Sequence, residues 1–345
     1  MNTDEVSIRT AGRAGRITLT RPKALNALTH VMVHAIDEAL DQWQDGQMVG
    51  LVLIDAEGTK AFCAGGDIAA LYHSGTAGDF DSGRRFWADE YALNARISNH
   101  PIPYVAIMDG IVMGGGVGLS GHGSHRIVTE RSMVAMPECG IGLIPDVGGT
   151  WLLAKAPGHL GEFLGLTGWR MTGPDAILAG FADALVPGDR LDDLKATLEN
   201  TGSVAAIDDY RETPDETPLE AQIEFAERHF SHPTALDCLR SVESDTSEFA
   251  QKITGLMRRA CPLALACTFE MVRRVRTFEK LEDALALEYR FTWRSMTEAQ
   301  FLEGIRAQII EKDFKPSWTP DRLEDVTPDM VDRLLAPLGD DDLQL

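Results

Sequence analysis

Two carboxylic acids, Glu138 and Asp146, stand in a segment that is otherwise apolar and rich in glycine and proline. The segment is residues 136–149, MPECGIGLIPDVGG. Apolar surroundings raise the pKa of a carboxylic acid and suit it to proton transfer. Two purely structural interpretations also fit: Glu138 could belong to a buried ion pair, and Asp146 could be a helix N-cap. The spacing of the two acids leaves both kinds of interpretation open.

Two glycine-rich turns precede this segment, and each follows an expected strand. They are residues 61–68, AFCAGGDI, and residues 113–119, MGGGVGL. Adjacent glycines allow a positive φ and a close approach to the backbone amides, and the first N–H groups of a helix have no intrahelical acceptor. The second turn lacks both the Walker lysine and the dinucleotide GxGxxG pattern. Two such turns can aim one amide each at the same oxygen, as an oxyanion hole requires. The alternative is that they are only tight turns and close packing points.

Another acid, Glu90, lies on the apolar stripe of a helix expected over residues 83–98. It comes four residues after Phe86 and three before Leu93, so the three side chains share one helix face. A carboxylate on such a stripe either pairs with a cation or faces a cavity. The sequence does not decide between the two.

Other nucleophiles fit the sequence less well. The stretch Gly118-Leu-Ser-Gly-His122 lacks the second glycine that a GxSxG elbow needs. Cys63 and Cys139 each adjoin a candidate segment, but a lone buried cysteine usually serves packing. We therefore expect the carboxylates, rather than a serine or a thiol, to do the chemistry.

The composition excludes several classes of protein. The chain has 345 residues and a formal net charge of −21, which argues against nucleic-acid and anionic-membrane partners. The five cysteines form no CxxC pair, so we expect neither a disulfide framework nor a metal site. No window approaches 18 uninterrupted apolar residues, and the start lacks a basic stretch followed by an apolar one. We expect no membrane span, no signal peptide and a cytoplasmic location.

The order of patterns predicts a layered α/β fold. Residues 6–20 alternate like a β-hairpin, a helical period follows from Leu28, and residues 49–56 form a short apolar run typical of a buried strand. After residue 150 the patterns become helical, with three helices expected over 262–277, 280–295 and 298–311. Three segments are predicted: a core over 1–187, an acidic helical insertion over 188–256 and a C-terminal helical region over 257–345.

Taken together, these motifs resemble the crotonase superfamily of acyl-coenzyme A enzymes. The order and spacing of RPKALNAL, AFCAGGDI, GGGVGLS and MPECGIGLIPDVGGT match it over residues 5–190, and FLEGIRAQIIEKDFKPSW resembles its C-terminal helix. The resemblance implies a spiral of ββα units with a helical C-terminal region. It also implies a small-molecule acyl-CoA substrate and no separate cofactor, since coenzyme A is part of the substrate. Trimers are frequent in this superfamily, which makes a homo-oligomer one expectation. The alternative is that the insertion near residues 190–255 blocks or replaces the usual trimer contact.

The resemblance also assigns roles to residues. The backbone N–H groups of Gly66 and Gly115 would polarise the thioester carbonyl. The positions implied to lie along coenzyme A are Gly65, Asp67, Ile68 and Lys23, the last near the adenosine end.

One departure selects a branch of the superfamily. Hydratases similar to this chain use two glutamates, three and twenty-three residues after the central oxyanion glycine. Counted from Gly115, these positions hold Gly118 and Glu138, so one of the two acids is missing. The chain instead resembles the 3-hydroxyisobutyryl-CoA hydrolases. That resemblance implies that Glu90, Glu138 and Asp146 line the acyl pocket and that the reaction belongs to valine catabolism.

The expected reaction is hydrolysis of a short-chain hydroxyacyl thioester. Glu138 would either attack the carbonyl or act as general base on water, and Asp146 would orient the substrate hydroxyl or manage the second proton. Two alternatives stay open. One is an enoyl-CoA hydratase or isomerase that uses Glu138 with a different second acid. The other is a noncatalytic acyl-CoA-binding protein that keeps only the fold.

Overall fold

The protein, seen in a computed structural model that describes residues 3–345, consists of two compact units. The first contains Met1–Gly66, Asp89–Ala135 and Arg170–Glu220. The second contains Asp67–Ala88, Met136–Trp169 and Ala221–Leu345. Each unit is therefore assembled from segments that lie far apart in the sequence.

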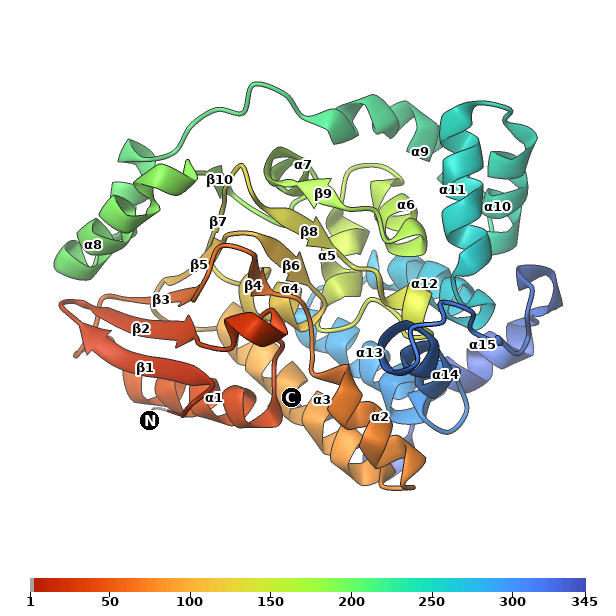
Figure 1. Cartoon of the computed structure of the whole chain (residues 1–345), viewed down its shortest axis with the longest axis horizontal. Coiled ribbons are helices and arrows are strands. Elements are labelled where there is room, and N and C mark those ends of the chain that lie inside the picture. Colours follow the sequence, from red (N-terminus) through yellow and green to blue (C-terminus); the bar gives the residue numbers. More distant parts are fainter. Residues whose placement is uncertain (1–2) are drawn as a thin grey trace. The chain divides into compact units, whose positions relative to one another are not determined.

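A six-stranded sheet forms the core of the first unit, in the order β1-β2-β3-β5-β7-β10. The bounds are β1 (Val6–Ala11), β2 (Ala14–Leu19), β3 (Leu51–Ala56), β5 (Tyr104–Met108), β7 (His125–Val128) and β10 (Ala184–Leu185). The antiparallel pair β1–β2 is the hairpin expected from the alternation, and its two strands run side by side in Figure 1. The remaining pairs are parallel. All five residues of β5 are buried, as expected for parallel strands covered on both faces.

A smaller four-stranded sheet also belongs to the first unit, in the order β4-β6-β8-β9. Its strands are β4 (Ala61–Cys63), β6 (Ile111–Met113), β8 (Met133–Ala135) and β9 (Met171–Thr172). Along the chain, each of β3, β5 and β7 is followed by one strand of this sheet and then by a helical segment. This threefold repeat of strand, strand and helix confirms the predicted ββα pattern.

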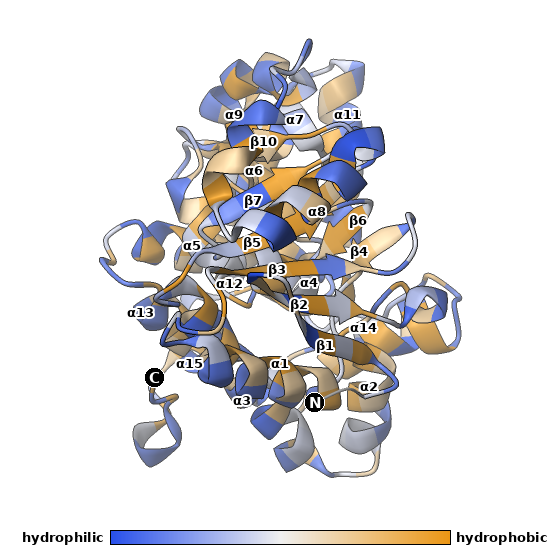
Figure 2. Cartoon of the chain, turned by 90° about the vertical axis from the view of Figure 1, so that its left-hand side faces the viewer, coloured by the Kyte–Doolittle hydropathy of each residue, from blue (hydrophilic) through white to orange (hydrophobic). Residues whose placement is uncertain are grey.

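Helices complete the first unit. They are α1 (His30–Trp43), α4 (Gly115–Ser120), α7 (Gly173–Leu178), α8 (Leu191–Thr201), η1 (Pro22–Ala24), η3 (Gly188–Arg190) and η4 (Val204–Asp209). Leu191, Leu194 and Leu198 of α8 recur at helical spacing and pack with buried residues of the large sheet. In Figure 2, orange hydrophobic residues make up much of β3 in this sheet. The chain thus contributes to this core beyond residue 187, and the three predicted segments remain a prediction about organisation.

The second unit is helical. Its elements are α2 (Ile68–Thr76), η2 (Glu138–Ile141), α5 (Gly149–Lys155), α6 (Leu160–Thr167), α9 (Ile223–Phe230), α10 (Ala235–Ser244), α11 (Glu248–Arg259), α12 (Pro262–Val275), α13 (Leu281–Ser295), α14 (Phe301–Ile305), a π-helical turn (Arg306–Ile310), η7 (Leu323–Asp325), α15 (Pro328–Leu335) and η8 (Gly339–Asp341). Two helices span a boundary between segments of the two units: η5 (Pro218–Gln222) and the long α3 (Phe80–Ser98).

Helix α12 lies at the centre of the second unit. It contacts α5, α6, α10, α13 and α15, and ten of its fourteen residues are buried, which explains its nearly all-round apolar sequence. Helices α10 and α11 lie side by side (Figure 1). The three helices predicted after residue 260 are confirmed, although the last continues from α14 into a π-helical turn. Among the described residues, no helix is both long and apolar enough to cross a membrane.

Candidate functional site

The two glycine-rich turns meet in the first unit. Gly66 follows β4, and Gly115 is the first residue of α4. A Cβ atom built on Gly115 would lie 3.4 Å from the backbone nitrogen of Gly66. Leu28 holds the first turn in place, because its N–H donates to Gly65 O at 2.8 Å and it pairs with Gly66 in an isolated β-bridge. The neighbourhood expected for Gly66 and Gly115 is therefore present.

The amides of both glycines are available to a ligand. Gly114 is the N-cap residue of α4 and has a φ of 48°. Its carbonyl oxygen accepts hydrogen bonds from Val117 N and Gly118 N. Gly115 stands at the first helical position, where an N–H has no intrahelical acceptor. Within residues 3–345, neither Gly66 nor Gly115 donates to a backbone carbonyl. Two neighbouring donors of this kind can stabilise a negative oxygen.

Glu90 of α3 lies against the same turns. It is buried, with 2% of its surface exposed, and its Oε1 lies 2.7 Å from the position of a Cβ atom on Gly115. The first unit thus brings together three of the residues that the sequence singled out: Gly66, Glu90 and Gly115. A Cβ atom at residue 115 would require the Glu90 carboxylate to move.

Sequence reasoning missed Asn94, which stands one helical turn after Glu90. Its side chain is fully buried, and neither its Oδ1 nor its Nδ2 has a hydrogen-bond partner within residues 3–345. An unsatisfied buried amide is costly, so such groups are uncommon away from functional sites. The signal was available, because residues i and i+4 share a helix face and Glu90 had already been placed on it.

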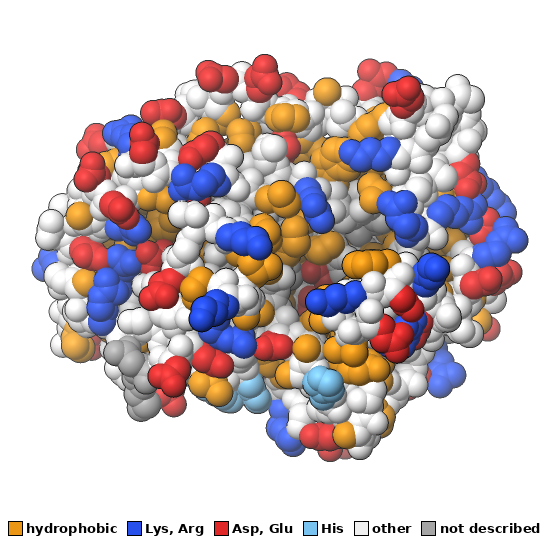
Figure 3. All heavy atoms as spheres, in the orientation of Figure 1, with side chains coloured by type: hydrophobic (Ala, Val, Ile, Leu, Met, Phe, Trp, Pro, Cys, Tyr) orange, Lys and Arg blue, Asp and Glu red, His pale blue; other side chains and the backbone are white. Residues whose placement is uncertain are grey.

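The positions implied to hold coenzyme A are distributed over both units. In the first unit, Lys23 is exposed in η1, and Gly65 adopts a φ of +117°, which favours glycine. In the second unit, Asp67 occupies the N-cap position of α2 and Ile68 begins that helix. The face drawn in Figure 3 carries many Lys and Arg side chains among the acidic ones, so the net negative charge is not uniform. An anionic ligand can therefore find local cations.

Glu138 and Asp146 belong to the second unit, and both are 5% exposed. Burial and, next, the negative charge of Asp146 raise the pKa of Glu138 well above its ordinary value. The Oε2 atom of Glu138 has no hydrogen-bond partner within the described chain. The two largest influences on the pKa of Glu138 are therefore burial and a like charge, and not the cation that an ion pair would supply. A carboxyl group with a raised pKa is a stronger base than an exposed glutamate, which suits Glu138 to proton transfer.

The loop that carries Asp146 has an uncommon backbone. Val147 has a φ of 54° and Gly148 a φ of 75°, and α5 begins only at Gly149 with Gly148 as its N-cap. Asp146 is therefore not a helix N-cap, and that alternative is wrong. A β-branched residue such as Val147 in the left-handed region is a genuine outlier, and such outliers cluster at functional sites.

A third acid of the second unit, Glu288 of α13, was missed from the sequence. It is fully buried and accepts hydrogen bonds from Gly148 N at 2.7 Å, from Thr150 N at 3.0 Å and from the Thr150 hydroxyl. Burial raises the pKa of Glu288 to about 8, against the lowering effect of these hydrogen bonds. Its signal in the sequence was a lone acid on an apolar helix face, without any motif around it.

The two candidate thiols are poor nucleophiles. Cys63 is fully buried, and desolvation raises its pKa to about 12. Burial also raises the pKa of Cys139, whose Sγ lies 3.2 Å from Thr268 Oγ1. Both stay protonated at neutral pH, and the thiolate is the reactive form. The packing interpretation of these cysteines fits the structure.

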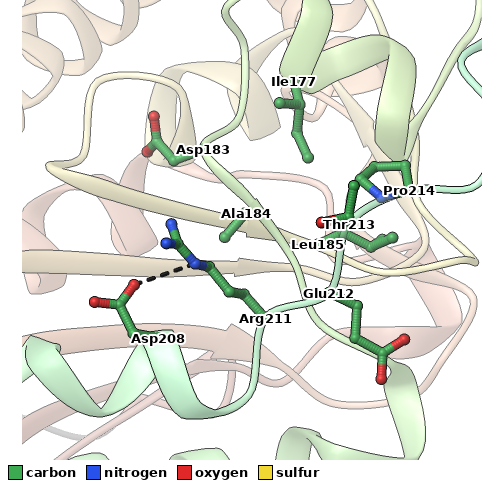
Figure 4. Close-up of a pocket in the computed structure, with 9 residues that line it drawn as sticks. All are labelled: Ile177, Asp183, Ala184, Leu185, Asp208, Arg211, Glu212, Thr213 and Pro214. Carbon is green, nitrogen blue, oxygen red and sulfur yellow. Dashed lines mark ion pairs between the residues drawn. The ribbon is translucent and has the colours of Figure 1, made fainter.

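A pocket of about 320 Å³ lies elsewhere in the first unit, next to β10. Figure 4 shows the ion pair between Asp208 and Arg211 in its wall, at 3.2 Å. The residues that line it are Ile177, Asp183, Ala184, Leu185, Asp208, Arg211, Glu212, Thr213 and Pro214. None of the predicted site residues is among them. The catalytic chemistry considered above does not involve this pocket.

Comparison with known proteins identifies relatives along almost the whole chain. The model of the enoyl-CoA hydratase/isomerase family matches residues 14–335. The 3-hydroxyisobutyryl-CoA hydrolase, mitochondrial, of Danio rerio is 39% identical over 99% of this chain and 92% of that protein. The protein of the same name from Rattus norvegicus is 40% identical, over 99% of this chain and 91% of that protein.

Two solved structures share the fold closely. An enoyl-CoA hydratase from Rhodobacter sphaeroides superposes with a TM-score of 0.95 at 49% identity, covering 99% of this chain and 100% of that one. A carnitinyl-CoA dehydratase from Mycobacterium thermoresistibile also gives a TM-score of 0.95, at 42% identity and 99% coverage of both chains. The names of the sequence relatives and of the two structures thus describe different reactions on CoA thioesters.

Proposed function

Since this chain belongs to the enoyl-CoA hydratase/isomerase family, known as the crotonases, we propose that it hydrolyses 3-hydroxyisobutyryl-CoA to 3-hydroxyisobutyrate and coenzyme A. Curated 3-hydroxyisobutyryl-CoA hydrolases at 36–40% identity over nearly the full length support the thioester hydrolase activity. The reaction is a step of valine catabolism. The residue roles given below are part of the proposal.

One observation favours hydrolysis over hydration of a double bond. Gly118 stands at the position where similar hydratases carry their first glutamate, and it is buried within α4. A glycine has no side chain to move a proton. Water addition by two glutamates is therefore blocked at this position, whereas thioester hydrolysis needs only a polarised carbonyl, an activated nucleophile and a leaving thiolate.

The amides of Gly66 and Gly115 have the role of oxyanion donors. Their adjacency and the lack of backbone acceptors support this role, because the donors are preorganised before the negative charge develops. Removal of one such donor typically costs about 10²–10³ in rate, or roughly 2.7–4 kcal/mol. Glu90 beside them is assigned to the polar end of the acyl group.

Glu138 is the residue that activates the oxygen nucleophile. It either attacks the thioester and forms a mixed anhydride, releasing the thiolate, or removes a proton from the attacking water. Asp146 orients the substrate hydroxyl or handles the second proton. The raised pKa of Glu138 supports both versions, because a carboxylate with a raised pKa is, once ionised, a stronger base and a stronger nucleophile.

Replacement of Glu138 by Gln tests this assignment. The E138Q variant is expected to lose most of the free-thiol release from 3-hydroxyisobutyryl-CoA and to bind coenzyme A as the unchanged protein does. Full retained turnover would remove Glu138 from the mechanism. A single turnover in ¹⁸O water then separates the two versions, since only the anhydride route places the label in the Glu138 carboxylate.

The second candidate function is hydration or dehydration of an acyl-CoA. The names of the two solved structures at 49% and 42% identity favour it. It requires a second acid in place of the missing glutamate, and Asp146 is the residue that would have to supply it. A noncatalytic acyl-CoA-binding role predicts binding without turnover of any CoA ester, so the same assays distinguish all three.

Assembly and location complete the proposal. We expect a homo-oligomer, to be measured by light scattering on the purified chain. The curated relatives carry the word mitochondrial in their names, which describes those proteins. For this chain the cytoplasm remains the prediction, and cell fractionation with an antibody tests it.

A further inference from the structure

We propose that Glu288 is a positioning residue for Asp146, because its carboxylate holds the loop from Asp146 to Thr150 in the conformation that presents the Asp146 side chain. This inference rests on the proposed function, since it concerns the same acids. Three donors from one loop converge on this carboxylate: Gly148 N–H, Thr150 N–H and the Thr150 hydroxyl. All three bonds are buried.

The backbone of this loop needs such support. Val147 and Gly148 both have positive φ, at 54° and 75°. A β-branched residue in this region is strained and stays there only where its surroundings hold it. Within the loop, Gly149 N donates a hydrogen bond to Asp146 O at 2.6 Å. From α13, the Glu288 carboxylate stabilises the loop by accepting the hydrogen bond of Gly148 N.

Charge links Glu288 to the two other acids of the second unit. Burial is the main cause of the raised pKa of Glu288 and of Glu138; Asp146 adds to the first, and Asp146 and then Glu288 add to the second. In the described chain, no lysine or arginine is among the main electrostatic influences on Glu138 or Glu288. Glu162, equally buried in this unit, differs because Arg273 and Arg276 pair with it at 2.6 and 2.7 Å. Glu288 is therefore held by donors of the loop rather than by an arginine ion pair of the kind that Glu162 forms.

Four variants test the positioning role. E288Q keeps the shape but places an amide NH₂ against one of the loop donors, and T150V removes the hydroxyl donor. Both are expected to lower kcat for thioester hydrolysis by about tenfold or more while KM changes by less than about threefold. T150S keeps the hydroxyl and should restore kcat. E162Q, the matched buried acid, is expected to lower stability without this split between kcat and KM. If E288Q and T150V keep kcat, or if E162Q shows the same split, the proposal is overturned.

A measurement without substrate separates this proposal from the proposed function. Glu288 has a folded-state pKa of about 8, above the value of roughly 4.3 for an exposed glutamate. Its contribution to stability is therefore full below the unfolded-state pKa and is lost as the pH rises toward 8. E288Q should lose less stability than the unchanged protein across this window in urea unfolding. If no acyl-CoA is hydrolysed, the proposed function is wrong, but the unfolding experiment still tests Glu288 because it needs no substrate. Equal pH dependence of stability in E288Q and the unchanged protein would contradict the raised pKa of Glu288 in the folded state.

A different part of the first unit carries a second inference: we infer that His30, His34 and Asp89 bind a divalent metal ion of the zinc class. His30 and His34 are four residues apart on α1, so their rings share one face, and the ring centroids are 4.5 Å apart. Asp89 of α3 lies beside both, with its Oδ2 at 2.6 Å from His30 Nε2 and 3.4 Å from His34 Nε2.

The geometry suits a small tetrahedral ion. One ligand atom from each residue lies within 4.8 Å of the other two. Around zinc, with bonds of about 2.0–2.1 Å, tetrahedral ligand atoms are roughly 3.3 Å apart, so small side-chain rotations suffice. Two imidazoles and one carboxylate favour zinc and its first-row neighbours over magnesium or calcium, which prefer oxygen ligands. All three side chains are 38–58% exposed, which leaves room for a water as fourth ligand.

Such an ion would connect α1 to α3 directly before Glu90. Asp89 and Glu90 are consecutive residues of α3, and Glu90 lies over Gly115. A metal bond at Asp89 would therefore fix the part of α3 that presents Glu90. The bond would also replace the present contact between His30 Nε2 and Asp89 Oδ2.

Calorimetry with zinc chloride tests the site on the full chain after chelator treatment. We expect one zinc ion per chain with a Kd below about 10 μM, and binding weakened at least about tenfold in H34A and in the H30A/H34A double variant. H73A, which removes an exposed histidine of α2, is the matched control and should bind as before. Bound cobalt should show the absorption of tetrahedral coordination. Binding only at millimolar zinc, or binding unchanged in the double variant, would overturn the inference.

Discussion

Glu90 Oε1 lies 2.7 Å from the position that a Cβ atom on Gly115 would occupy. The same Cβ atom would stand 3.4 Å from Gly66 N. The carboxylate and the two amides therefore lie together in the first unit, and glycine at residue 115 lets Glu90 keep its place beside them. The proposed oxyanion donors and the position of Glu90 are thus linked through Gly115.

Replacement of Gly115 by Ala should disturb this arrangement without unfolding the protein. Alanine keeps the backbone N–H, but the added methyl group must displace Glu90 Oε1, so we expect kcat/KM for thioester hydrolysis to fall by up to about 10²-fold, the effect of a misplacement of about 1 Å. Steady-state kinetics measure the loss, and circular dichroism checks the fold. In G255A the new Cβ atom would meet Arg259 Nη1 at an ordinary 3.5 Å, so this control should keep its activity. Unchanged kinetics in G115A would contradict the role of this glycine.

Removal of the charge of Asp146 should shift the pH dependence of catalysis. The Asp146 carboxylate raises the pKa of Glu138, so in D146N the pKa of Glu138 falls. Because Glu138 acts in its ionised form, the acid limb of the kcat/KM–pH profile should move to lower pH, while the maximum rate drops. An acid limb that stays in place, or moves to higher pH, would show that the two carboxyls are not coupled in the working enzyme.

Cys63 should be dispensable for turnover. Its thiol is buried with a pKa of about 12 and donates to Gly65 O at 3.5 Å, a long and weak contact. We expect C63A to keep kcat within about threefold of the unchanged protein, at a stability cost of about 1 kcal/mol for the small cavity. Thiol release from the substrate, followed continuously, measures the rate. A loss of several hundredfold with an intact fold would point to a cysteine nucleophile instead.

Much of the fold could be predicted because its signals are local. The hairpin of β1 and β2 follows from strict alternation, and α12 and α13 follow from helical periods bounded by Pro262 and Lys280. The chain after Ile305 forms a π-helical turn, which the hydrophobic periodicity of the sequence does not predict. The pairing of β3, β5 and β7 in one sheet came from the family resemblance and not from the strand patterns themselves.

The candidate site was predictable where chemistry leaves a motif. Gly66, Gly115, Glu138 and Asp146 stand in short segments of unusual composition, and their turns and burial agree with that reading. Glu288 and Asn94 have no such segment. Each is a single polar residue on a helix face. Only the folded structure shows that Glu288 accepts hydrogen bonds from a distant loop and that the buried Asn94 amide has no hydrogen-bond partner among the described residues.

The most direct test of the account compares two reactions of the purified, unchanged protein. Free-thiol release from 3-hydroxyisobutyryl-CoA is measured beside the loss of the enoyl absorbance of crotonyl-CoA, with E138Q as the blank for both. The account predicts rapid thiol release that E138Q abolishes, and no hydration of crotonyl-CoA. Hydration of crotonyl-CoA without thiol release would contradict the hydrolase assignment and would leave the family and its fold in place.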